Sequence, residues 1–242
     1  MSQATPNAHD AAELARDANY PISRWYLRPL ARLLSQKLAS TWARPWWFTL
    51  ANLLLNALAM ALLGWQPEWC MAAAVCVAAG WFADRMDGCL ARRQGTASAY
   101  GAWLDGNIDE LIDLTLHTVM AFVVAERTGN SGVWGLLVAF LIGKYLFLHS
   151  LQAPAGSEEI KSSPSHVRTK PAGVWCWLRA MYHAPANADV RCHLTIIALI
   201  GGQFNARWLL AELACLAVYY NLRWLARYGL TYRRLAGSVG SA

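Results

Sequence analysis

The strongest signal in this chain is DRMDGCLARRQGTASAYGAWLDGNID, residues 84–109. It places four aspartates, Asp84, Asp87, Asp105 and Asp109, in segments that otherwise have the composition of membrane helices. An ionised Asp at the centre of a bilayer costs roughly 2.5–3.5 kcal/mol on insertion scales, and several close together would also repel one another. Divalent cations bind carboxylate oxygens and offset both costs. The pattern therefore predicts a metal site inside or near a membrane.

The first pair of aspartates lies on one face of a predicted helix. Asp84, Asp87 and Ala91 are spaced three and four residues apart, and Gly88 lies beside them. Residues at this spacing share a helix face, and the small side chains let a ligand or another helix approach the backbone. Arg92 lies one turn after Gly88 and offers a guanidinium fork that suits phosphate.

The second pair continues this pattern on the next predicted helix. Gly101, Asp105 and Asp109 follow one another at intervals of four residues, after a turn of polar and small residues. If the two helices are antiparallel neighbours, they present their carboxylates to each other. Carboxylates, a cation, small residues and an arginine together indicate a site for a phosphate-bearing ligand. Helix packing with structural salt bridges is the alternative interpretation.

Composition places these helices in a membrane protein. The chain has 242 residues, of which 56% are hydrophobic and only 15% are charged, whereas soluble domains have about 25% charged residues. We predict an all-α integral membrane bundle of about six transmembrane helices. Their expected ranges are roughly 46–64, 69–91, 101–125, 132–151, 192–204 and 207–230.

The other segments are polar or amphipathic. Residues 1–20 form a polar N-terminal tail. Residues 21–45 combine a leucine stripe with Arg and Lys, which predicts a juxtamembrane amphipathic helix on the membrane surface. The transmembrane domain is expected over residues 46–234, interrupted by a long polar segment at about 152–190.

Basic residues are divided unevenly between the two sides of the predicted bundle. With the N-terminus in the cytoplasm, that side carries most of the Lys and Arg, and the opposite side has only Arg127 and Arg207. By the positive-inside rule, the aspartates then lie at the cytoplasmic face of the cell membrane. The same topology explains the net charge of +6, so we expect no nucleic-acid partner.

Eight residues of the opening stretch resemble the signature of the CDP-alcohol phosphotransferases, also called CDP-alcohol phosphatidyltransferases. These are integral membrane enzymes of phospholipid biosynthesis. The matching residues are Asp84, Asp87, Gly88, Ala91, Arg92, Gly101, Asp105 and Asp109. The predicted layout of helices is also similar to this family, so the likeness covers most of residues 21–234.

The resemblance implies an activity and a metal requirement. A phosphoalcohol group, such as phosphatidyl, would pass from a CDP-linked alcohol such as CDP-diacylglycerol to the hydroxyl of a small acceptor, with release of CMP. Asp84, Asp87 and Asp105 would bind Mg²⁺ or Mn²⁺, with two ions per site. Asp109 would be a further ligand or the base that takes the proton from the acceptor. The resemblance also implies a homodimer.

Six residues are expected around the cytidine and phosphates of the donor. They are Gly88, Ala91, Arg92, Gly101, Thr49 and Asn52. The Pro-Asn pair that the family often has near the first span is absent here, where the chain reads RPWWFTLANLL. Ordinary polar contacts in helix packing are therefore the alternative interpretation of Thr49 and Asn52.

Further charged residues are candidates for the acceptor pocket. Lys144, Arg191 and Arg223 resemble, by rough position, basic residues that hold a phosphorylated acceptor in some family members; anchoring of the helices is the alternative. Asp113 extends the row of Asp105 and Asp109 by one helical turn. Glycerol phosphate, inositol phosphate, an amino alcohol and a free polyol all remain open as acceptors, and the basic residues favour an anionic one.

Two other functions fit parts of the pattern. A membrane prenyltransferase also uses aspartates and magnesium on a pyrophosphate, but it would carry two acidic motifs on separate halves of the chain. An ion-binding transporter would favour repeated halves and broken helices, which the sequence does not show. Release of CMP from a CDP-alcohol, dependent on Mg²⁺ or Mn²⁺, separates the three.

Overall fold

The computed structural model describes residues 20–152 and 183–239. Within these two ranges the chain is helical and contains no strand, which confirms the predicted all-α class. Nearly all of the predicted polar tail at 1–20 and most of the polar segment at 152–190 lie outside the described residues.

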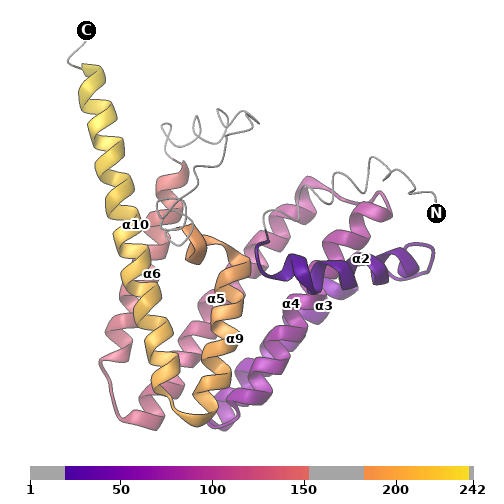
Figure 1. The fold of residues 1–242 in the computed structure, drawn as a ribbon, viewed down its shortest axis with the longest axis horizontal. Helices are drawn as coiled ribbons and strands as arrows, with labels where there is room; N and C mark the ends of the chain where they lie inside the picture. Colours follow the sequence, from indigo (N-terminus) through magenta and orange to yellow (C-terminus); the bar gives the residue numbers. More distant parts are fainter. Residues whose placement is uncertain (1–19, 153–182, 240–242) are drawn as a thin grey trace.

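Seven α-helices and two short 3₁₀ helices make up the described ranges. In chain order they are η1 (Ser23–Trp25), α2 (Leu27–Leu38), α3 (Pro45–Trp65), α4 (Cys70–Arg93), α5 (Ala99–Thr128), α6 (Val133–Gln152), η2 (Ala184–Ala186), α9 (Ala188–Phe204) and α10 (Arg207–Val239). The long helices run side by side, and α2 lies across α3 and α4 (Figure 1). Every predicted span thus coincides with a helix.

Three helices are long and apolar enough to cross a membrane. They are α3, α6 over Val133–Leu151 and α10 over Arg207–Arg233. The other three predicted spans fall short of that criterion for physical reasons. Charged residues of the signature interrupt α4 and α5, and α9 has only 17 residues. The six-span arrangement itself therefore stays a prediction.

The predicted helix over residues 21–45 is too long. After α2 ends, residues 39–44 form a connection and not a further helical turn. Arg44 adopts an extended conformation with ψ of 142°, and Pro45 begins α3. A residue before proline avoids the helical region, whereas proline itself fits the first turn of a helix. The arginine–proline pair therefore sets where α3 begins.

The helix α2 packs on α4 through small and flexible side chains. Ala31 is fully buried and forms one apolar cluster with Met86 and Cys89 of α4. The outward side of α2 carries Leu30 and Leu33, which are exposed. The helix therefore has one face on the bundle and another that is free to meet lipid.

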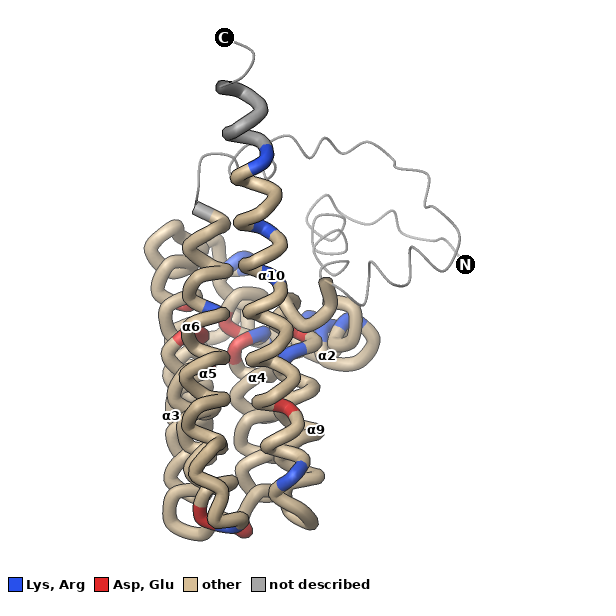
Figure 2. Tube along the Cα trace, turned by 90° about the vertical axis from the view of Figure 1, so that its left-hand side faces the viewer, with Lys and Arg blue, Asp and Glu red and all other residues tan. Residues whose placement is uncertain are grey.

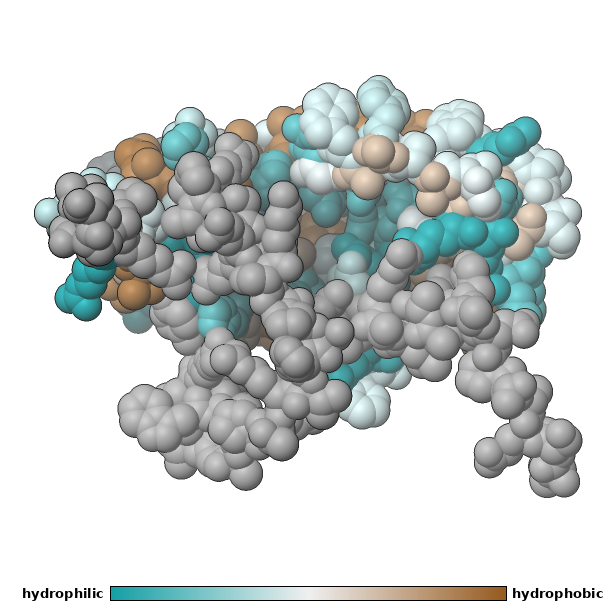
Figure 3. Space-filling view, turned by 90° about the horizontal axis from the view of Figure 1, so that it is seen from above, coloured by the Kyte–Doolittle hydropathy of each residue, from teal (hydrophilic) through white to brown (hydrophobic). Residues whose placement is uncertain are grey.

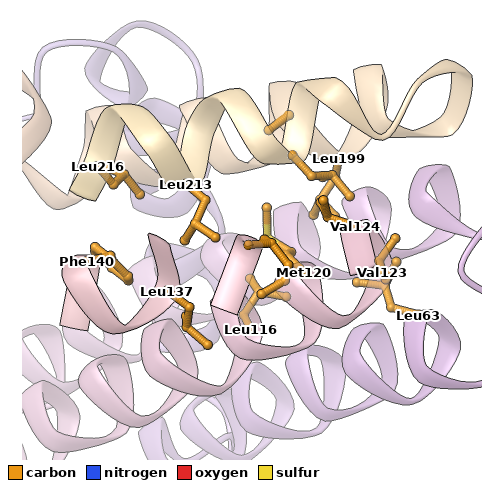
Figure 4. Packing of buried hydrophobic residues seen from close by; sticks show 14 of the residues in the cluster. Leu63, Leu116, Met120, Val123, Val124, Leu137, Phe140, Leu199, Leu213 and Leu216 are labelled. Atoms are coloured by element: carbon orange, nitrogen blue, oxygen red, sulfur yellow. The ribbon is translucent and has the colours of Figure 1, made fainter. Parts of the chain in front are cut away.

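The main core joins six helices. Side chains from α3, α4, α5, α6, α9 and α10 interdigitate in this core, part of which is drawn in Figure 4. The labelled members are Leu63, Leu116, Met120, Val123, Val124, Leu137, Phe140, Leu199, Leu213 and Leu216. In a lipid environment such close packing stabilises helix association by dispersion forces.

Two glycines let helices approach closely. A Cβ on Gly80 of α4 would lie 2.5 Å from Asn56 Nδ2 of α3, and one on Gly143 of α6 would lie 2.9 Å from the backbone nitrogen of Asn221 of α10. The Asn221 amide also donates to the Ala139 carbonyl of α6 at 2.8 Å. Small residues and interhelical hydrogen bonds of this kind are typical of membrane bundles. Thus α3 pairs with α4, and α6 pairs with α10.

Charged residues gather at one level of the bundle. Figure 2 shows most of the described Lys, Arg, Asp and Glu at the height of α2 and above, while the helices below are mostly uncharged. Seen from that end, hydrophilic side chains lie in a recess between the helices (Figure 3). This end of the molecule holds the candidate site.

Candidate active site

The helix α4 presents two buried carboxylates. Asp84 and Asp87 are only 5% and 8% exposed. The Thr49 hydroxyl of α3 donates to Asp87 Oδ2 at 2.8 Å, and an Arg85 nitrogen lies 2.5 Å from Asp84 Oδ2. Among the residues that the structure describes, none donates a hydrogen bond to the buried Asp84 Oδ1. This oxygen is therefore available to a ligand.

The turn between α4 and α5 returns the chain toward these carboxylates. Gly95 has φ of 67°, in the left-handed region that glycine adopts without steric cost. The Ser98 hydroxyl then accepts from the Gly101 amide at 3.0 Å and caps the start of α5. This register brings Asp105 and Asp109 back to the level of α4.

Three aspartates from the two helices meet as one group. Carboxylate oxygens of Asp84, Asp105 and Asp109 lie within 4.8 Å of one another; with the adjacent Asp87, we call them the aspartate cluster. At this separation two ionised carboxylates repel by about 3.5 kcal/mol at an effective dielectric constant of about 20. Arg85 balances one of the three converging charges. The rest require added cations or protons, and oxygen-only ligands suit Mg²⁺ or Mn²⁺.

The acidic helices leave room between them. The predicted antiparallel pair does not pack along its length: α5 packs mainly on α3, and α4 packs on α3, α2 and α9. The carboxylates therefore meet across a gap that is bordered by two cavities. Both cavities are lined by Asp87, Gly88, Arg92 and Asp105.

One of these cavities collects most of the residues expected around the donor nucleotide. It has a volume of about 320 Å³ and lies between α3, α4 and the start of α5. Five of the six expected residues line it: Thr49, Gly88, Ala91, Arg92 and Gly101. Its outer wall includes Trp46, Tyr100 and Leu104, which are exposed. We call it the Trp46 cavity.

The second cavity lies on the α2 side of the aspartate cluster. Its volume is about 310 Å³, and Tyr20, Arg28 and Arg85 line it together with signature residues. We call it the Arg28 cavity. Sequence reasoning missed these three residues. Arg85 could have been found because it lies inside the signature, but the approach of residues 20 and 28 depends on how α2 packs against α4.

Asn52 lies apart from the other residues expected around the nucleotide. It is buried and accepts a hydrogen bond from Asn56 Nδ2 at 2.8 Å. It lines a small cavity of about 80 Å³ together with Asp109, Asp113 and Arg191. It is one turn further along α3 than Thr49 and lines a different cavity from that residue.

Asp113 forms the centre of a second charged group. Its carboxylate pairs with Lys144 of α6 and lies 3.3 Å from Arg191 Nε of α9. Lys144 also lies 2.6 Å from Glu110, and Arg191 donates to the Tyr220 hydroxyl at 2.9 Å. We call these residues the Asp113 cluster. Two acids and two bases balance one another here.

Polar residues continue from this cluster into the bundle. His117 Nδ1 lies 3.5 Å from Asp113, and its Nε2 lies 3.7 Å from Glu212 of α10. The Thr195 hydroxyl of α9 donates to the same glutamate at 2.6 Å. Glu212 was not among the predicted site residues, although a glutamate within an apolar span is itself a signal.

Arg223 does not belong to the Asp113 cluster. Its guanidinium lies 5.0 Å from the centre of the Phe147 ring and 3.2 Å from His183 Nδ1. The structure therefore brings together Lys144, Arg191 and Asp113 from the predicted acceptor set, and it places Arg223 elsewhere on α10.

A helical bundle with signature aspartates between two helices defines the class of protein. The chain belongs to the CDP-alcohol phosphatidyltransferase family, which it matches over residues 42–202. This match confirms the resemblance seen in the eight signature residues. With three helices suited to crossing a bilayer, the chain is a membrane protein of this transferase family.

A second comparison is with a curated archaeal relative. The chain is similar to the archaetidylinositol phosphate synthase of Pyrococcus horikoshii, with 32% identity over 123 residues. The match covers 51% of this chain and 61% of the length of that relative.

Proposed function

We propose that this protein transfers a phosphoalcohol group, such as phosphatidyl, from a CDP-linked lipid to the hydroxyl of a small acceptor, releasing CMP. The observation that carries this proposal is the convergence of Asp84, Asp105 and Asp109 within 4.8 Å of one another. The Trp46 cavity beside them supports it further, because its polar residues suit a nucleotide and its apolar wall suits a lipid.

The aspartate cluster fits divalent cations. Asp84, Asp87, Asp105 and Asp109 would hold Mg²⁺ or Mn²⁺, as two ions in our proposal. The buried Asp84 Oδ1, which accepts no hydrogen bond from the described residues, supports this assignment. When bound, such ions neutralise the charge that develops on the phosphates during transfer.

Asp109 lies where the two substrates would meet. It belongs to the aspartate cluster and also lines the small cavity beside Arg191. We assign it as the base that takes the proton from the acceptor hydroxyl. The acceptor oxygen forms a bond to the lipid-side phosphorus, the bond from this phosphorus to the bridging oxygen breaks, and CMP leaves with the electron pair.

The acceptor in our proposal is a phosphorylated polyol. Lys144 and Arg191 would bind its phosphate, with Asp113 holding both cations in position. The name of the archaeal relative supports an inositol phosphate as the first acceptor to test. Arg223, which lies beside Phe147 and His183, would act from further away.

The site would lie at a membrane surface. We propose that α3, α4, α5, α6, α9 and α10 all cross the bilayer, with α2 on its cytoplasmic face, in the cell membrane. The gathering of most described charged residues at and above the height of α2 in Figure 2 supports this placement. The family resemblance also suggests a homodimer, which light scattering on the detergent-solubilised protein would test.

The decisive experiment measures release of CMP. Purified protein receives CDP-diacylglycerol in mixed micelles with Mg²⁺ or Mn²⁺ and, in turn, inositol phosphate, glycerol phosphate, inositol or serine. We expect CMP and a new phospholipid with a phosphorylated acceptor. Absence of CMP with every acceptor and both metals would contradict the proposal and favour a transporter or a prenyltransferase.

A further inference from the structure

A helix outside the family signature forms one wall of the Arg28 cavity. Arg28 of α2 is 5% exposed and lines this cavity. Its guanidinium carbon lies 4.3 Å from the centre of the Tyr20 ring, and that of Arg85 lies 4.8 Å from the same ring. Arg85 also lies over Trp81 at 4.0 Å. Aromatic contacts of this kind hold two guanidinium groups near each other despite their like charge.

The start of α2 is fixed to the bundle at a second point. The buried Asp189 carboxylate of α9 accepts hydrogen bonds from the backbone amides of Ile22 and Ser23 at 2.8 and 3.0 Å. The Tyr26 hydroxyl lies 2.5 Å from His193 Nε2, one turn further along α9. These contacts set the position of the helix turn that carries Arg28.

Arg28 and Arg92 converge on one residue of α4. Nitrogens of their guanidinium groups lie 3.7 and 3.4 Å from the buried Cys89 sulfur. The two side chains come from different helices, yet they reach the same wall of the cavity. Two such forks side by side match the oxygens of a diphosphate better than one does.

The charges of the Arg28 cavity favour an anion once a metal is bound. Three arginines and three aspartates line it: Arg28, Arg85, Arg92, Asp84, Asp87 and Asp105. These side chains balance one another, so each divalent cation at the aspartates adds two positive charges. A pyrophosphate diester carries about two negative charges, so it offsets one such ion fully and the proposed two ions by half.

We propose that Arg28, together with Arg92, binds the pyrophosphate of the CDP-linked donor, so that α2 is part of the donor site. This inference rests on the proposed function. It adds to the donor site a residue of α2, Arg28, which lies 56 residues before the first signature aspartate, Asp84.

This role is tested by isothermal titration calorimetry, in which CDP is titrated into the full-length protein in detergent with Mg²⁺. CDP contains both phosphates and needs no knowledge of the lipid tail. We expect Arg28→Gln to weaken CDP binding by about tenfold or more. Arg28→Lys keeps the charge but loses the fork, so we expect a loss of about threefold. The matched control is Arg24→Gln, because Arg24 is exposed and stacks on Trp25.

The outcomes separate this inference from the proposed function. Wild-type protein that neither binds CDP nor releases CMP would overturn both. Wild-type binding that is unchanged in a folded Arg28→Gln variant would overturn only the role of Arg28. If thermal unfolding shows that Arg28→Gln does not fold, Arg28→Lys decides: equal affinity for CDP overturns the inference, and a loss with Arg24→Gln unaffected supports it.

Discussion

The aspartate cluster and the Asp113 cluster lie one helical turn apart on α5 and differ in how their charges are met. Asp109 shares its site with Asp84 and Asp105, whose oxygens come within 4.8 Å, with Arg85 as counterion. Asp113 instead contacts Lys144 and Arg191. The first group has more acidic groups than cations of its own and would bind metal ions in our proposal, whereas the second is balanced by the protein itself. Buried acidic residues therefore indicate a metal site only when their own cations are too few.

Removing the metal should have the largest effect. We expect EDTA, or Asp84→Ala with metal present, to lower CMP release by about 10⁴-fold, because the neutralising charge is worth several kcal/mol. Turnover measured before and after adding back Mn²⁺ checks this. The Asp113 cluster holds no such ion in our account, so a Lys144→Met variant should bind as much Mn²⁺ as wild type. If that variant bound much less Mn²⁺ than wild type, the Asp113 cluster would also take part in metal binding, contrary to the comparison above.

Asp109→Asn should reduce turnover next most strongly. The amide cannot take the proton of the acceptor hydroxyl, so we expect kcat to fall by about 10²–10³-fold. CDP titration with Mn²⁺ measures the loss of donor binding, which we expect to be smaller than the loss of turnover because the other three aspartates of the cluster remain. A variant that keeps near-full turnover with metal bound would show that Asp109 is not the base.

Asp113→Asn should act mainly on stability. It leaves Lys144 and Arg191 buried without their shared carboxylate, and we expect the free energy of unfolding to fall by about 3 kcal/mol. Unfolding in detergent, followed by circular dichroism, measures this. Because Asn and Asp have nearly the same volume, the variant changes the charge without changing the packing. Unchanged stability would mean that the two cations find other partners.

Asp105→Asn should have the smallest effect and the opposite sign. Without metal, it removes a charge from a group of mutually repelling carboxylates, so the variant should gain about 1 kcal/mol in stability. The comparison is made in EDTA, since metal would reverse it. A loss of stability in EDTA would mean that Asp105 has a structural partner and that the two clusters are alike.

The parts of the site that follow helix periodicity could be predicted from the sequence. Spacings of three and four residues place Asp84 and Asp87 on one face of α4, and Asp105 and Asp109 on one face of α5. The pairing of Lys144 with Asp113 was harder to predict from the sequence, because it depends on how α6 packs on α5. Arg223 had the same type of signal and lies with Phe147 and His183. Helical periodicity determines which residues share a face of a helix, but it does not determine which other helix packs against that face.

The remaining differences arise from contacts between distant segments. The role of α2 depends on Asp189 accepting the amides of Ile22 and Ser23, 166 residues or more away in the sequence. The predicted helix over residues 21–45 extends past the end of α2 at Leu38, and the local signal at Arg44–Pro45 marks only the start of α3. The gap between α4 and α5 could not be foreseen, because a short turn equally allows close packing.

The exposed wall of the Trp46 cavity has an energetic consequence. Trp46, Tyr100 and Leu104 border the cavity and are open to the surroundings of the bundle. In our proposal, the donor lipid would therefore bind there with its acyl chains still among neighbouring lipids. Extracting each methylene into water would cost about 0.8 kcal/mol, so a chain of about sixteen carbons would cost more than about 10 kcal/mol. A donor lipid that enters from the side of the bundle would avoid this cost, because its acyl chains would not pass through water.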